Sequence, residues 1–168
     1  CLTFEEAEQV KMEFGAALDH RVADNVTVDC AAGIPDSGIA HAIGYANEKK
    51  VPYMRPFVKY TPTWPRSFMP QNQNIRDLVA KMKLLPNKAV IKDNRGIFLD
   101  DSIVRGTQLK DNVRDLHDAG IREVHMRIAC PPLTYPCEFL NFSRSRSSAE
   151  LATRKAILQL EGTENVDY

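Results

Sequence analysis

The sequence lacks the features that mark membrane proteins and general nucleic-acid binders. No apolar run approaches the roughly 20 residues that a helix needs to cross a bilayer, and the N-terminal residues predict a charged amphipathic helix, not a signal peptide. The 22 Lys and Arg residues equal the 22 Asp and Glu residues, so there is no net charge to attract polyanions. We therefore expect neither membrane nor nucleic acid among its partners.

The sequence also lacks any Cys-x-x-Cys pair among its four cysteines, and its four histidines are scattered, so a zinc site has no support. Unpaired thiols are typical of a reducing compartment, from which we expect a cytoplasmic protein. What is present is a chain of 168 residues, 43% hydrophobic and 26% charged, which suits one compact domain with a hydrophobic core. No internal repeat or low-complexity tract is visible.

Apolar spacing predicts helices that alternate with strands. Apolar residues at helical spacing predict a first helix over 4–19 whose buried face consists of Phe4, Ala7, Val10, Phe14 and Leu18. Thr3 and Glu6 form a capping-box pattern at its start. Further helices are expected over 39–46, 76–84, from 107 to 120, and from about 148 to 160. Strands are expected over 25–33, 51–59, a short stretch within 87–92, 96–100 and 123–129, and 161–168 is a polar tail.

This alternation predicts an α/β fold with a mainly parallel central sheet flanked by helices. In such sheets ligands bind at the carboxyl ends of the strands. Three polar loops fall there: GIPDSG (33–38), LDDSIVRGTQ (99–108) and ACPPLTYPC (129–137). Residues 60–75 contain three prolines and no sustained period, which is typical of a flexible functional lid or of a disordered segment.

The second loop begins with two adjacent carboxylates, Asp100 and Asp101, at the end of an apolar strand. Such a pair is tolerated where a divalent metal or ligand hydroxyls share its charge. Residues 102–107 then lead into a helix N-terminus, whose free N–H groups and dipole favour an anion. Gly106 allows close backbone approach, and the Thr107 hydroxyl can add a hydrogen bond. The combination suits a sugar phosphate, although an ordinary turn followed by an ordinary helix cap would have the same residues.

The loop resembles the phosphoribosylpyrophosphate (PRPP) loop of type I phosphoribosyltransferases, and its form DDSIVRGT is that of the amidophosphoribosyltransferases, also called glutamine PRPP amidotransferases. The segments GIPDSGIAHAIGYANEKKVPY (33–53) and GIREVHMRIACPP (120–132) are similar to that family in the same order. The resemblance covers nearly the whole chain. It implies a type I phosphoribosyltransferase-like fold and a single transferase domain over 1–168.

The resemblance also implies roles for individual residues. Asp100 and Asp101 would meet the ribose hydroxyls and the PRPP-bound Mg²⁺, and Ser37 would approach the metal and the pyrophosphate. The catalytic set would be Asp100, Asp101, Lys59 and Arg66. The residues that bind PRPP would be Ser37, Lys83, Asp100, Asp101, Ser102, Ile103, Val104, Arg105, Gly106 and Thr107, with 102–107 around the 5-phosphate.

The implied enzyme is a glycosyltransferase (pentosyltransferase) that displaces pyrophosphate from PRPP with ammonia to give 5-phosphoribosylamine in purine biosynthesis. The resemblance further implies a homo-oligomer and a glutaminase partner, in cis or in trans, because we find no glutaminase sequence here. We expect no iron–sulfur cluster, since no Cys-x-x-Cys accompanies Cys137.

Two alternatives stay open. The segment KYTPTWPRSFM (59–69) departs from the family's usual lid sequence, which would suit a PRPP or nucleotide sensor without catalysis. A nucleobase salvage phosphoribosyltransferase is the other alternative, with Trp64 as a lone candidate for stacking on a base.

Overall fold

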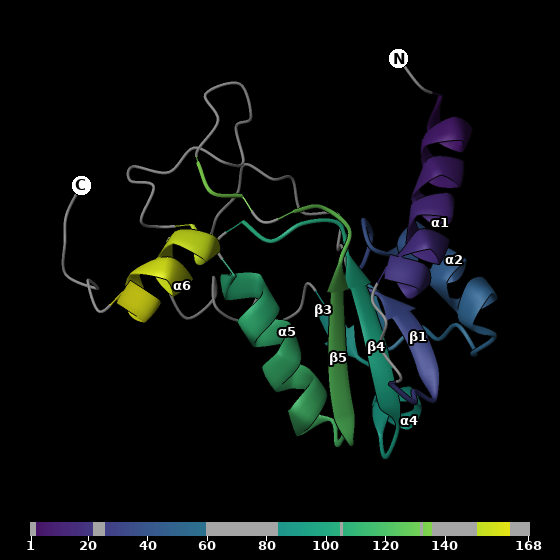
Figure 1. Cartoon of the computed structure of the whole chain (residues 1–168). Coiled ribbons are helices and arrows are strands. Elements are labelled where there is room, and N and C mark those ends of the chain that lie inside the picture. The colour runs from purple at the N-terminus through teal and green to yellow at the C-terminus, as the bar shows by residue number, and fades with distance from the viewer. Residues whose placement is uncertain are drawn as a thin grey trace, which may run out of the picture.

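The computed structural model describes residues 3–21, 26–59, 84–104, 106–131, 133–135 and 151–161. Its centre is a parallel sheet of β1 (Cys30–Gly33), β4 (Arg95–Asp100) and β5 (Glu123–Ile128), in the order β1-β4-β5 (Figure 1). All three strands end at the same edge, because Gly33 pairs with Leu99 and Asp100 pairs with Ile128. The mainly parallel α/β fold that the sequence predicts is confirmed.

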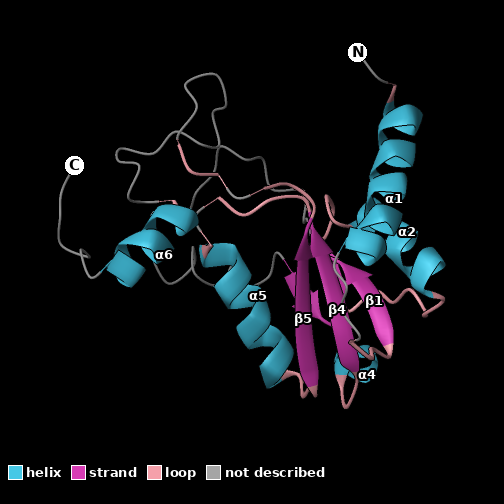
Figure 2. Ribbon diagram, viewed as in Figure 1, coloured by secondary structure: helices cyan, strands magenta, loops and turns pink. Residues whose placement is uncertain are grey.

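Helices cover both faces of this sheet (Figure 2). Along β4, Ile97 and Leu99 face a core formed with α1 (Phe4–Arg21) and α2 (Ile39–Lys49). The intervening Phe98 faces a second core formed with α5 (Thr107–Asp118) and α4 (Lys88–Ile91). This alternation follows from the two-residue period of a strand, and it fixes which way the end of β4 points.

Two smaller elements and a last helix complete the described chain. The strands β2 (Phe57–Lys59) and β3 (Leu84–Pro86) form a separate antiparallel pair. The helix α6 (Ala152–Glu161) lies beside the N-terminal end of α5 (Figure 1). No helix in the described ranges is both long and apolar enough to cross a membrane.

The extent of α1 and its capping box are as expected, since the N–H of Glu6 donates to Thr3 Oγ1 (3.2 Å) and the N–H of Thr3 donates to Glu6 Oε2 (2.7 Å). The predicted buried face is wrong. Of its members, Leu18 is buried, whereas Phe4, Val10 and Phe14 are 81%, 49% and 39% exposed.

The reason is that glycines make the contact between α1 and α2. A Cβ atom at Gly15 would lie 1.9 Å from His41 O, and one at Gly44 would lie 1.8 Å from Met12 O. The two helix backbones therefore touch, and the side of α1 that faces inward is set by this close approach. A count of large apolar side chains cannot detect such a face.

Two expected elements also differ in type. The strand predicted within 87–92 is the single helical turn α4, which buries Ile91. Four residues are too few for periodicity to separate a strand from a helix. Leu84, expected at the end of a helix, begins β3 and pairs with Lys59. The rest of that expected helix, the segment 60–75 and the tail after Glu161 lie outside the described residues.

Candidate functional site

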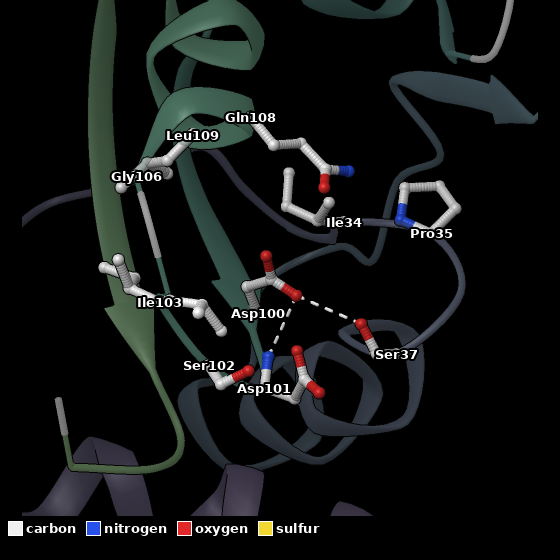
Figure 3. A pocket seen from close by; sticks show the side chains of 11 residues that line it. Ile34, Pro35, Ser37, Asp100, Asp101, Ser102, Ile103, Gly106, Gln108 and Leu109 are labelled. Carbon is white, nitrogen blue, oxygen red and sulfur yellow. Dashed lines mark hydrogen bonds between the residues drawn. The ribbon is translucent and has the colours of Figure 1, made fainter. Parts of the chain in front are cut away.

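The carboxyl ends of β1 and β4 open into a cavity of about 420 Å³. Its walls are the loop after β1, the loop after β4 and the first turn of α5 (Figure 3). The lining residues are Ile34, Pro35, Ser37, Asp100, Asp101, Ser102, Ile103, Val104, Gly106, Gln108 and Leu109. Two of the three loops that the sequence places at strand ends thus face one another across a single cavity.

The loop after β1 is fastened to the end of β4. The N–H of Ile34 donates to Leu99 O (2.9 Å), and the N–H of Gly38 donates back to Ile34 O (2.9 Å). This turn carries Ser37 to the end of β4, where its hydroxyl donates to Asp100 Oδ1 (3.1 Å). The same carboxylate oxygen accepts the backbone N–H of Asp101 (2.9 Å).

Asp100 is in an environment that opposes its charge. Burial raises the pKa of the Asp100 carboxyl from 3.8 to about 6. The negative charge of Asp101 adds to this rise in pKa. The hydrogen bonds from the backbone of Asp101 and from Ser37 oppose it. A cation beside the two carboxylates would favour the charged form, so the pair is suited to receive one.

The oxygen atoms of Asp100, Asp101 and Ser37 could supply part of the ligand set of a magnesium ion. No three His, Cys, Asp or Glu side chains gather in a metal-binding arrangement anywhere in the described part of the chain. Mg²⁺ is commonly held by one or two carboxylates, with water and substrate phosphates as its other ligands. Asp100 and Asp101, with Ser37 beside them, offer that partial set of ligands and leave the remainder to a phosphorylated substrate.

The loop after β4 is held on its other side by the chain after β5. Asp100 O accepts the N–H of Ala129 (3.0 Å), and Asp101 O accepts the N–H of Cys130 (2.8 Å). Gly106 then adopts a left-handed conformation (φ 73°) as the N-cap of α5. The first N–H groups of a helix have no acceptor within it, so the start of α5 supplies donors and a favourable dipole for an anion.

Of the residues expected around the 5-phosphate, Ser102, Ile103, Val104 and Gly106 line the cavity. Thr107 is the first residue of α5, and its side chain lies outside the described part, as does all of Arg105. The expected contacts Arg66 and Lys83 are also outside the described residues.

Lys59 is not among the lining residues. It ends β2, and its ammonium Nζ forms an ion pair with Asp36 Oδ2. Asp36 stands between Pro35 and Ser37, which both line the cavity, so the ion pair holds Lys59 next to the cavity.

Sequence reasoning missed Asp36 and four lining residues. Ile34 and Pro35 belong to the GIPDSG loop, so the placement of that loop was already a signal for them. Gln108 and Leu109 are in the first turn of α5, and the Gln108 side chain extends toward the loop after β1 (Figure 3). The contact of Asp36 with Lys59 joins two elements whose pairing the sequence does not indicate.

No family model matches the chain, but the similar curated proteins carry one name. It is 46% identical over 109 residues to an amidophosphoribosyltransferase of Pyrococcus horikoshii, covering 65% of this chain and 24% of that protein. It is 39% identical over 142 residues to the Synechocystis enzyme of the same name, covering 84% of this chain and 28% of that protein.

Among solved structures, the chain resembles the glutamine PRPP amidotransferase from B. subtilis complexed with ADP and GMP. The TM-score is 0.75 at 31% identity, over 95% of this chain and 35% of that one. The chain spans about a quarter of the length of the curated relatives that it matches.

Proposed function

By sequence and fold the chain belongs with the amidophosphoribosyltransferases, over about a quarter of their length, and on that premise we propose that it is a PRPP-dependent transferase domain. In this proposal it displaces pyrophosphate from PRPP with ammonia and gives 5-phosphoribosylamine, as in purine biosynthesis. The observation that carries the proposal is one cavity that contains both a carboxylate pair and the loop at the start of α5.

The two ends of that cavity suit the two ends of a sugar phosphate. Asp100 and Asp101 are acceptors for the ribose hydroxyls. The backbone of 102–104, that of Gly106 and the first turn of α5 offer N–H donors for the 5-phosphate. A substrate held at both ends has its reacting carbon fixed between them, which lowers the entropic part of the barrier to substitution.

The chemistry that remains is the departure of pyrophosphate and the approach of ammonia. Positive charge develops at the ribose carbon as the bond breaks, and in this proposal the negative carboxylates of Asp100 and Asp101 favour that charge. In this proposal Lys59, which pairs with Asp36 beside the cavity, neutralises negative charge that develops on the departing pyrophosphate. When bound at the carboxylates, Mg²⁺ supplies further neutralisation of the diphosphate.

Other parts of the prediction await direct tests. A glutaminase, in the same protein or in a partner, would supply ammonia, and the active species would be a homo-oligomer. The roles predicted for Arg66, Lys83, Arg105 and the segment 60–75 concern residues outside the described ones and stay predictions.

A pyrophosphate-release assay tests the proposal. The purified chain, given PRPP, Mg²⁺ and a high concentration of ammonium salt, should release pyrophosphate, and Asp101→Ala should not. Release by the wild-type chain no greater than that by Asp101→Ala would contradict the proposal. Tight PRPP binding in calorimetry without any release would instead favour the sensor, which the departure in 59–69 made an open alternative.

A further inference from the structure

The helix α6 begins directly against the loop that we assign to the 5-phosphate. The backbone N–H of Ala152, the first residue of α6, donates to Val104 O (2.9 Å). Leu151, which precedes it, is fully buried. A carbonyl in the middle of the phosphate loop is therefore tied to a helix far away in the sequence.

Gly106 and Ala152 also bring the same two segments close together. Gly106 has a left-handed backbone (φ 73°), and a Cβ atom placed on it would lie 3.3 Å from Ala152 Cβ. This distance is tighter than an ordinary van der Waals contact between carbons. Ala152 therefore packs closely on the residue where the loop turns into α5.

The far side of α6 has an anchor of its own. Arg154 Nε donates to Thr134 O (3.1 Å), and its guanidinium lies over the Tyr135 ring, 4.6 Å from the centroid. Thr134 and Tyr135 belong to the chain after β5, whose first residues also bind the backbone of Asp100 and Asp101. The helix thus connects the loop after β4 with the segment after β5.

We propose that α6 is a brace that fixes the backbone of 102–104 and of Gly106 in the conformation that binds phosphate, and that Ala152 is its positioning residue. An anion site built from backbone N–H groups binds tightly only when those groups are already in place, because otherwise binding must first order them. The phosphate part of this inference rests on the proposed function, whereas the bracing contact itself does not.

The test compares the same substitution at two positions of one helix. Ala152→Val adds two methyl groups against Gly106, whereas Ala156→Val adds them at an exposed position of α6. Both changes introduce a β-branched residue into α6, and the cost in helix propensity is greater at Ala156 in the middle of the helix than at Ala152, its first residue, so a larger effect at 152 cannot come from propensity. Two readouts are needed: hydrogen exchange of the amides in 102–109 without ligand, and calorimetric affinities for ribose 5-phosphate and for magnesium pyrophosphate.

We expect Ala152→Val to weaken ribose 5-phosphate binding on the order of tenfold, about 1.4 kcal/mol, and to speed amide exchange in 102–109. We assign magnesium pyrophosphate to the Ser37 side of the cavity. Its affinity should therefore change by less than about twofold, much less than the affinity for ribose 5-phosphate. Ala156→Val should match the wild type in every measurement. This split between the two ligands separates a brace from a general loss of stability.

If Ala152→Val does not fold, Ala152→Gly takes its place, with Ala156→Gly as its control. Ala152→Gly removes the methyl group that lies close to Gly106 and keeps the backbone N–H that donates to Val104 O. Equal exchange and equal ribose 5-phosphate affinity in the variants at 152 and 156 would overturn the brace. If the variant at 152 speeds amide exchange in 102–109 but the wild type does not bind ribose 5-phosphate, the brace is supported and the proposed function is contradicted.

Discussion

Replacing Asp100 with Asn should stabilise the folded chain at neutral pH although it damages the site. The Asn side-chain oxygen can still accept the hydrogen bonds that Asp100 Oδ1 receives from Ser37 Oγ (3.1 Å) and from the N–H of Asp101 (2.9 Å). What the substitution removes is a negative charge that burial and the neighbouring Asp101 both oppose.

The magnitude follows from the pKa of Asp100, which burial raises from 3.8 to about 6, a rise of about two units. At about 1.36 kcal/mol per unit the full effect would be roughly 3 kcal/mol. The side chain is only partly buried, so solvent screening reduces the expected effect to about 1–2 kcal/mol. Because the folded state binds this proton more tightly than the unfolded chain, ionisation of Asp100 lowers stability as pH rises from about 4 through about 6.

Urea unfolding of the two proteins between pH 4 and pH 8 measures this difference. Asp100→Asn should be more stable than the wild type by about 1–2 kcal/mol at pH 8, with the difference vanishing near pH 4. Asp111→Asn, which removes an exposed carboxylate from α5, is the control for the loss of one negative charge. A difference at Asp100 that is independent of pH, or a loss of stability at pH 8, would refute the reasoning.

Three further predictions concern neighbouring features. Gly44→Ala should lower the free energy of unfolding by about 3 kcal/mol or more, since its Cβ atom would lie 1.8 Å from Met12 O; denaturation with a change below about 1 kcal/mol would show that the helices are free to separate. Burial lowers the pKa of His41 from its ordinary 6.5, so the folded state resists its protonation and loses stability as pH falls below 6.5; His41→Gln should flatten that loss, and an unchanged slope would exclude His41 as its cause. Asp36→Asn should weaken magnesium pyrophosphate binding by up to about fivefold, because Lys59 loses the exposed ion pair, worth at most about 1 kcal/mol, that holds it beside the cavity; tighter binding in calorimetry would show that Asp36 competes with the diphosphate for Lys59 instead.

The parts of the site that sequence predicts well are those set by local order along the chain. The strand that ends in Asp100 and the helix that begins at Thr107 are visible in apolar spacing and in the turn at Gly106. Because parallel strands end at one edge, the loops after β1 and β4 had to meet there, and Ser37 does lie beside Asp100.

What the sequence does not predict depends on contacts between distant segments. The inward face of α1 is set by Gly15, which carries no side chain for a periodicity count to register. The ion pair of Asp36 with Lys59 requires knowledge of where β2 packs, and β2 lies outside the main sheet. The contact of Ala152 with Gly106 is invisible for the same reason, since small apolar residues occur in helices everywhere.

A calorimetric titration of the chain with PRPP, with and without Mg²⁺, tests the proposed PRPP site most directly. We predict stoichiometric binding that requires Mg²⁺ and that Asp101→Ala abolishes, because the carboxylate pair and the loop at the start of α5 share one cavity. Absence of binding by the wild-type chain, or binding that neither Mg²⁺ removal nor Asp101→Ala affects, would contradict it.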